Sequence, residues 1–171
     1  MEISEREKQS SIAQNGYTLI EILVALTIIG LLFGFGYASF RDFSRRQAVK
    51  DAAKIIQGDL RLAQENAISG LKPEGVGGCG TSNTLNSYGF RIVSASEYII
   101  EANCGVTPAP FIKDVNLPTG ITIQTPLPSV LEFKVLGQGT NVGSTNWTLT
   151  LIQSGTTNTT TVTVTAGGEI R

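Results

Sequence analysis

A single apolar run near the amino terminus constrains this chain more than any other feature. From Tyr17 to Phe40 the sequence carries one charged residue, Glu21, and such a run is long enough for a helix to cross a hydrocarbon layer of about 30 Å. An ordinary secretory signal has a shorter apolar core followed by a small-x-small cleavage site. Here the charged segment 41–46 follows directly. The run therefore predicts a membrane-spanning helix at 17–40 that is retained as an anchor.

A short motif at the start of the run makes this prediction more specific. Gly16-Tyr-Thr-Leu-Ile-Glu21 with its apolar continuation resembles the prepilin signal of type IV pilins and type II secretion pseudopilins. The resemblance implies a leader at 1–16, which a prepilin peptidase removes by cutting between Gly16 and Tyr17. It also implies that Tyr17 becomes the N-methylated first residue. The family usually has Phe at this position, so Tyr17 is a departure from its pattern.

Glu21 is the charged residue inside the run, and a carboxylate in lipid is costly unless it is paired or functional. One interpretation is that Glu21, close to the end of the helix, reaches the headgroups. The family resemblance implies the interpretation we favour, in which Glu21 pairs with the free amino group of Tyr17 on a neighbouring subunit. That pairing would set the axial stagger of helices in a filament.

The positive charges around the run favour the opposite membrane orientation from that of prepilins. The positive-inside rule counts Lys and Arg on each side of a span. Few precede the run and more follow it: Arg6 and Lys8 against Arg41, Arg45, Arg46 and Lys50. We give the prepilin motif more weight than this count, and the charges after the run remain unexplained by the sequence.

The helical pattern continues beyond the apolar run. Apolar residues recur at steps of three and four, which predicts an amphipathic helix with one buried stripe: Val49, Ala52, Ile56, Leu60, Ala63 and Ala67. The charged residues between them, Asp59 included, are predicted to form a solvated face. Gly70 is the expected C-terminal cap of a helix running from Tyr17 to Ser69, and Pro73 prevents its continuation. Gly30, Gly34 and Gly36 are either close-packing positions or points of bending.

Beyond Pro73 the hydrophobic period becomes two, which predicts β-strands. The candidates are Tyr88–Val93, Tyr98–Glu101, Ile121–Gln124, Val130–Leu136, Trp147–Ile152 and Thr160–Thr165. An antiparallel sheet packed on the apolar stripe gives an α+β fold, and the resemblance to type IV pilins implies that it is a pilin fold. The chain is thereby divided into a leader at 1–16, an assembly helix at 17–40 and an outer domain at 41–171, with helix 41–69 and β-region 74–171.

The composition argues against an enzyme. The chain has no histidine and two cysteines, so it can build neither a His-dependent triad nor a tetrahedral zinc site from Cys and His. We expect no cofactor and no metal. In an oxidising location outside the membrane, Cys79 and Cys104 are predicted to form a disulfide. The alternative is a pair of free thiols.

Short fragments of the outer region resemble the GspH/FimT group of minor pilins and pseudopilins. They include Tyr88-Gly-Phe, Glu132-Phe-Lys and the ending Gly167-Gly-Glu-Ile-Arg171. Some members of that group are thought to bind DNA through a terminal Gly-Arg-x-Arg. Here Glu169 replaces one basic residue and Arg171 stands alone. With few basic residues to neutralise phosphates, we do not expect nucleic acid to be a partner.

The predicted function is that of a structural subunit, a minor pilin or pseudopilin, in a type IV pilus or type II secretion pseudopilus. The resemblance implies these partners: the peptidase and methyltransferase, other pilin or pseudopilin subunits, the assembly ATPase, the inner-membrane assembly platform and membrane lipid. It places the outer domain outside the cytoplasm, and the assembled subunit in a surface pilus or periplasmic pseudopilus. Two alternatives remain open: a DNA-binding minor pilin of an uptake pilus, and a membrane-anchored β domain that never polymerises.

Overall fold

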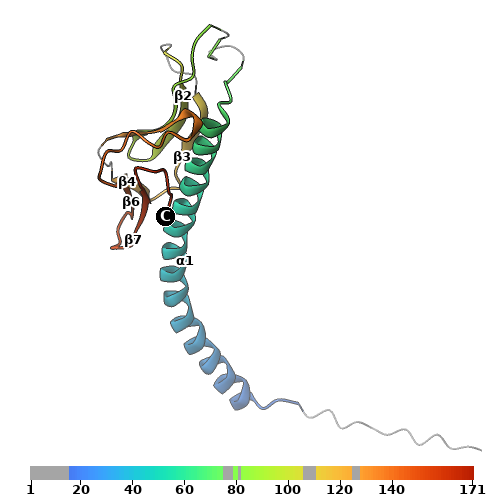
Figure 1. Cartoon of the computed structure of the whole chain (residues 1–171). Coiled ribbons are helices and arrows are strands. Elements are labelled where there is room, and N and C mark those ends of the chain that lie inside the picture. The colour runs from blue at the N-terminus through green and yellow to red at the C-terminus, as the bar shows by residue number, and fades with distance from the viewer. Residues whose placement is uncertain (1–15, 75–78, 81, 106–110, 125–127) are drawn as a thin grey trace, which may run out of the picture. The chain divides into compact units, whose positions relative to one another are not determined.

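The computed structural model describes residues 16–74, 79–80, 82–105, 111–124 and 128–171, without the side chains of residues 35–39. It divides into two compact units, residues 1–41 and 42–171, and one helix, α1 (Leu19–Ser69), runs from the first into the second. Figure 1 shows α1 followed by the strands that make up most of the second unit. The predicted helix-then-strand order is confirmed.

The carboxyl end of α1 is closed by a Schellman motif at the predicted cap. Gly70 has φ +64°, a left-handed conformation that glycine adopts without a Cβ penalty. Its N–H donates to the Ala67 carbonyl at 3.3 Å, and the Leu71 N–H donates to the Asn66 carbonyl at 3.2 Å. These two bonds satisfy carbonyls that the end of a helix leaves unpaired.

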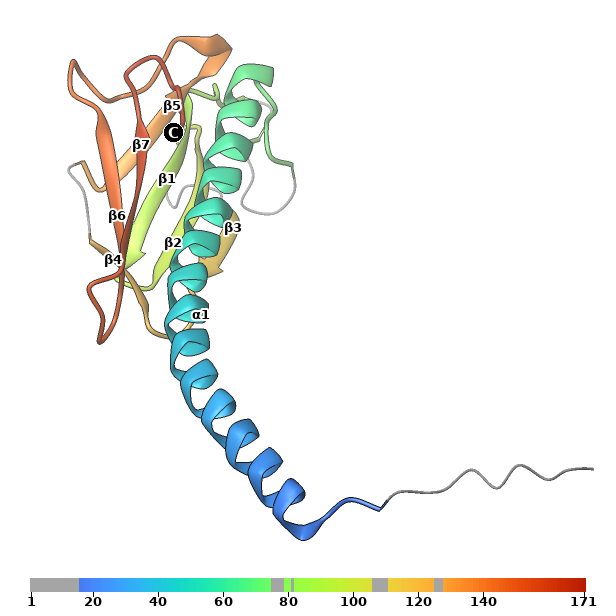
Figure 2. The same ribbon diagram turned by 90° about the horizontal axis from the view of Figure 1, so that it is seen from below.

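The strands form two antiparallel sheets rather than one. The first has the order β3-β2-β1-β5, from β1 (Ser87–Ser94), β2 (Glu97–Asn103), β3 (Phe111–Asn116) and β5 (Val130–Lys134). The second has the order β4-β6-β7, from β4 (Ile121–Gln124), β6 (Trp147–Gln153) and β7 (Thr159–Val164). Figure 2 shows α1 running across the first sheet. The architecture is α+β, as predicted.

One hydrophobic core joins the second half of α1 to the inner faces of both sheets. The predicted stripe from Val49 to Ala67 is buried there. The Phe90 ring of β1 stacks on Tyr98 of β2 with centroids 4.6 Å apart, and meets Trp147 of β6 edge-on at 5.9 Å. The contact with Trp147 connects the two sheets, whereas the contact with Tyr98 lies within the first sheet. Each contributes about 0.5–1.5 kcal/mol beyond the area it buries.

Two details of the strand prediction were wrong. Strand β3 was missed, because it is an edge strand whose side chains are mostly exposed and therefore lack the alternation of a half-buried strand. The strand predicted to reach Leu136 ends at Lys134, and a 3-10 turn follows (η1, Val135–Gly137). The Lys134 N–H donates to the Gly139 carbonyl at 2.9 Å, so the chain reverses before the apolar pattern ends.

Candidate assembly site

The amino end of α1 is capped by Thr18. The Glu21 N–H donates to Thr18 Oγ1 at 3.3 Å, and the Ile22 N–H donates to the Thr18 carbonyl at 3.2 Å. Thr18 and Glu21 thus occupy the N-cap and N3 positions of the pattern known as a capping box. This explains why the helix begins at Leu19 and not, as predicted, at Tyr17.

Glu21 lies in the first turn of α1, where the helix dipole favours a negative charge. Its side chain is exposed, and within the residues that the structure describes it has no ion-pair partner. The carboxylate is therefore available to a group outside this chain. The expected pairing of Glu21 with a neighbour's amino group stays a prediction, because the structure holds one copy.

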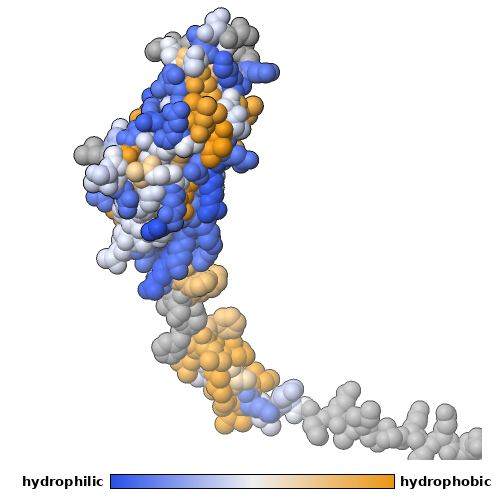
Figure 3. Space-filling view, in the orientation of Figure 1, coloured by the Kyte–Doolittle hydropathy of each residue, from blue (hydrophilic) through white to orange (hydrophobic). Residues whose placement is uncertain are grey.

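The first part of α1 presents large apolar side chains on its whole circumference. They are Leu19, Ile20, Ile22, Leu23, Val24, Leu26, Ile28, Ile29, Leu31, Leu32 and Phe33, and Figure 3 shows them gathered along the lower helix. Leu19, the first residue of the helix, is 83% exposed. A monomeric soluble protein rarely leaves so large an apolar surface uncovered, so this surface points to a partner or a lipid environment.

One face of this surface is a shallow, open apolar patch formed by Leu19, Ile22, Leu23, Leu26 and Thr27. The hydroxyl of Thr27 donates to the Leu23 carbonyl at 2.8 Å. Because that hydroxyl is satisfied by the helix itself, the patch offers an apolar contact surface. An apolar side chain or acyl chain fits it better than a polar group does.

No helix in the described part of the chain is long and apolar enough to cross a membrane. The predicted span at 17–40 includes residues 35–39, and their side chains lie outside the described residues.

The predicted cleavage site lies just ahead of α1. Gly16 and Tyr17 are exposed and outside the helix, and a Cβ built at Gly16 would meet no atom within 4 Å. A peptidase needs such an extended and accessible backbone at the bond it cuts. The rest of the predicted leader, residues 1–15, lies outside the described residues.

Cys79 and Cys104 form a disulfide, with Cα atoms 5.4 Å apart. Both side chains are buried. Cys79 lies in the segment after α1, where its N–H donates to the Pro73 carbonyl at 3.1 Å, and Cys104 directly follows β2. The bond therefore ties the segment after the helix to the end of β2, as predicted.

Asp59 was assigned wrongly to the solvated face of the helix. It is 6% exposed. One carboxylate oxygen accepts a hydrogen bond from the Tyr98 hydroxyl at 2.7 Å, and the other forms an ion pair with the Lys113 ammonium at 2.7 Å. Burial and the bond to Asp59 raise the pKa of Tyr98 well above its usual range. The spacing could have revealed this position, since Asp59 lies three residues after Ile56 and four before Ala63 of the buried stripe.

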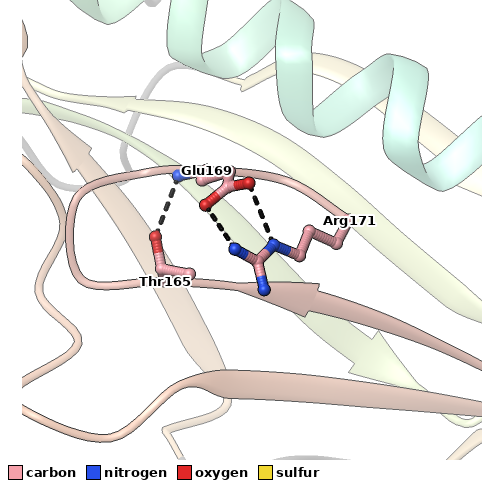
Figure 4. A network of polar contacts seen from close by, with 3 residues as sticks. All are labelled: Thr165, Glu169 and Arg171. Atoms are coloured by element: carbon pink, nitrogen blue, oxygen red, sulfur yellow. Dashed lines mark hydrogen bonds and ion pairs between the residues drawn. The ribbon is translucent and has the colours of Figure 1, made fainter.

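The guanidinium of Arg171 is held by a carboxylate of its own chain. Its Nε and Nη2 donate to the two carboxylate oxygens of Glu169, each at 2.9 Å, and the Glu169 N–H donates to Thr165 Oγ1 (Figure 4). The hydrogen bonds and the charge of Arg171 lower the pKa of Glu169. Arg171, the weak candidate for DNA binding, thus presents a compensated charge.

Two comparisons with known proteins bear on this site. A model of the prokaryotic N-terminal methylation motif matches residues 12–37. The chain is also 25% identical over 89 residues to the type IV major fimbrial protein FimA of Dichelobacter nodosus. That match covers 50% of this chain and 55% of the relative, so the chain spans about half the length of that curated relative. No solved structure matches.

The motif and the fimbrial relative support a type IV pilin-like protein with a prepilin-type methylation signal. The matched segment 12–37 contains Gly16, Tyr17 and Glu21 and leads into the exposed apolar surface of α1. Neither match identifies the GspH/FimT group, which remains a hypothesis from the sequence.

Proposed function

We propose that this protein is a structural subunit of a type IV pilus or a type II secretion pseudopilus, a minor pilin or pseudopilin of the GspH/FimT kind. The observation that carries the proposal is the exposed apolar surface of α1, which begins at a capped helix end with one acidic residue, Glu21. A filament that leaves the bilayer must keep this surface out of water, and packing it between like helices does so. Leaving it exposed would cost about 25 cal/mol for each Å² of apolar area.

In the proposed pathway the chain is first anchored in the inner membrane with its outer domain outside the cytoplasm. The prepilin peptidase cuts after Gly16, and Tyr17 becomes an N-methylated amino terminus. The assembly platform then transfers the subunit into a filament. There Glu21 pairs with the Tyr17 amino group of a neighbour, in a low-dielectric setting where a lone charge is costly.

A Glu21→Gln variant tests the charge pairing. It keeps the shape of the side chain and removes its charge, and breaking a buried pair from one side costs about 3–5 kcal/mol. We expect membrane insertion and leader cleavage to stay intact while the ratio of sheared-filament to membrane-pool protein falls. The matched control is Glu65→Gln, because Glu65 is an exposed carboxylate on the same helix. If the ratio is equal in cells with the native, Glu21→Gln and Glu65→Gln proteins, the proposed pairing of Glu21 with Tyr17, and its role in setting the axial stagger of the helices, would be overturned.

Intact-mass spectrometry of filament protein from the native host tests the processing. The expected chain begins at Tyr17 and carries one added methyl group. Filaments composed of chains that still begin at Met1 would contradict the proposed processing. A chain that keeps Met1 and is absent from filaments would favour the alternative of an anchored β domain, which needs neither Gly16 nor Glu21.

A further inference from the structure

A polar cleft of about 340 Å³ lies between α1 and the β6–β7 hairpin. It is lined by Arg46, Val49, Lys50, Thr157, Asn158, Thr159 and Thr160. Arg46 and Lys50 are one helical turn apart, so both project from the same face of α1. Val49 between them is buried in the core and gives the cleft an apolar floor.

The charge of this cleft is uncompensated. None of its lining residues is acidic, and within the described residues neither Arg46 nor Lys50 forms an ion pair. Both side chains are exposed. Two cations held close together on one face repel each other, and an anion between them removes that repulsion.

The opposite wall of the cleft is formed by three threonines and one asparagine, Thr157, Asn158, Thr159 and Thr160. In the part of the chain that the structure describes, the hydroxyls of Thr157, Thr159 and Thr160 make no hydrogen bond. The Asn158 N–H, in contrast, donates to Thr156 Oγ1 at 3.2 Å, which holds the hairpin tip in place. Successive side chains of a strand point to opposite faces, so Thr160 shares the inner face of β7 with the buried Val162, whereas Thr159 points to the outer face. The free hydroxyl of Thr160 is therefore the donor that β7 offers on the side of the core.

We propose that this cleft binds a phosphate group, and that the phosphate belongs to the headgroup of an anionic phospholipid. A guanidinium grips two phosphate oxygens with its planar fork, and an ammonium contributes a compact charge. Threonine hydroxyls complete the shell of donors. The choice of a lipid rests on the proposed function, because Arg46 follows the apolar run that would lie in the bilayer. The positive charges after the run, which conflict with the prepilin orientation, thereby acquire a role in binding.

The test uses the full chain in micelles of an uncharged detergent. Short-chain phosphatidylglycerol is titrated in, and native mass spectrometry counts the lipids retained. Short-chain phosphatidylcholine of equal chain length is the neutral comparison. The cleft variant is Arg46→Gln with Lys50→Gln. The matched control is Arg45→Gln with Arg61→Gln, which removes the same charge from exposed positions of α1 outside the cleft. The fluorescence of Trp147, the chain's one tryptophan, checks that each variant is folded.

We expect the native chain to retain phosphatidylglycerol about tenfold better than phosphatidylcholine, and the cleft variant to lose that preference while the control keeps it. If both double variants lose the preference for phosphatidylglycerol equally, the lipid is retained by diffuse surface charge, and the proposed binding site in the cleft is overturned. A Thr160→Val variant should weaken retention about threefold through the lost hydroxyl.

A competition arm separates the two sources of phosphate. Inorganic phosphate is added at constant ionic strength, with chloride as the replacement salt. Bound phosphatidylglycerol that stays in place supports a lipid site. Displacement of the lipid by millimolar inorganic phosphate would overturn the proposal that the bound phosphate belongs to a lipid headgroup. Because no filament takes part, this result and the Glu21→Gln filament result can fail independently.

Discussion

The Tyr98 hydroxyl donates a hydrogen bond to Asp59 Oδ2 at 2.7 Å, while the other oxygen of that carboxylate holds Lys113 at 2.7 Å. One buried acid on α1 thus binds two strands, β2 and β3, to the helix. Among the described residues, strand β3 is the edge of its sheet and pairs with β2 alone. The ion pair gives this edge strand a second attachment, through a side chain.

Replacing Asp59 should therefore destabilise the outer domain. In Asp59→Ala the buried Tyr98 hydroxyl loses its acceptor and Lys113 loses its counter-charge. Since the Lys113 side chain is 42% exposed, water compensates part of that loss, and we expect about 2–3 kcal/mol less unfolding free energy. Urea unfolding of the full chain in mild detergent, followed by Trp147 fluorescence, measures it. Asp51→Asn, at an exposed position of α1, should change stability by under about 0.5 kcal/mol; equal effects would refute a special role for Asp59.

Alkaline pH should destabilise the fold through Tyr98. Its pKa is raised, first by burial and then by its bond to Asp59. The native state keeps the phenolic proton at a pH where the unfolded chain, with a pKa of 10.0, has lost it. Stability is thus complete below about pH 10 and falls as pH rises further, by up to about 1.4 kcal/mol per pH unit. Urea midpoints should fall between about pH 9 and pH 11 in the native chain, and less in Tyr98→Phe. A Tyr98→Phe chain with an unchanged pH slope would contradict the assignment.

Loss of the disulfide should lower stability by about 3 kcal/mol. Cys79 and Cys104 are separated by 25 residues, and cross-linking them restricts the unfolded chain by about this amount. Urea unfolding of the Cys79→Ala, Cys104→Ala double variant and of the native chain, both oxidised and reduced, measures this change in unfolding free energy. Non-reducing peptide mapping checks the bond itself; two freely alkylated thiols in folded, oxidised protein would refute the pairing.

Gly139 should tolerate no side chain, in contrast to a nearby glycine. Its φ is +82°, and a Cβ there would lie 2.9 Å from the Ala166 carbonyl oxygen. Strain and the close contact together predict a loss of about 2 kcal/mol for Gly139→Ala. At Gly143 an added Cβ meets no atom within 4 Å and φ is not left-handed, so Gly143→Ala should be near neutral. Thermal unfolding of the Gly139→Ala and Gly143→Ala variants measures the difference. Equal melting temperatures would contradict the predicted strain and close contact at Gly139.

Arg171 should contribute little to binding of nucleic acid, since Glu169 compensates its charge. We expect Arg171→Gln to leave retention of plasmid DNA on an immobilised column unchanged. Glu169→Gln frees the guanidinium and can add at most one phosphate contact, which corresponds to a change of about 0.9 in the slope of log affinity against log salt. A large loss of DNA binding in Arg171→Gln would restore the DNA-binding alternative.

The helix was predictable because its signals are local. The stripe from Val49 to Ala67 and the glycine cap at Gly70 are encoded in spacing and residue type, and both were confirmed. The helix start at Leu19 follows from Thr18, a capping residue whose T-x-x-E pattern is visible in the sequence and was overlooked.

The strand pairing and the side-chain contacts of the site could not be predicted, because they depend on segments that are far apart in the sequence. Nothing in the order of strands states that β4 pairs with β6 while β5 pairs with β1. Likewise, the ion-pair partner of Asp59 is Lys113, which lies on an edge strand far away in the sequence. The same limit applies to Glu21, because its predicted partner belongs to another subunit.

The disulfide also decides how the chain carries mechanical load. A pull on α1 passes through Cys79 directly to Cys104, and the intervening segment, which contains β1 and β2, bears no tension. Cys104 lies 25 positions after Cys79, a distance of about 85 Å along an extended chain. Stretching the oxidised protein end to end therefore releases a contour length shorter by that amount, and reduction of the bond returns it. Strands β1 and β2 are thus shielded from force for as long as the bond remains oxidised.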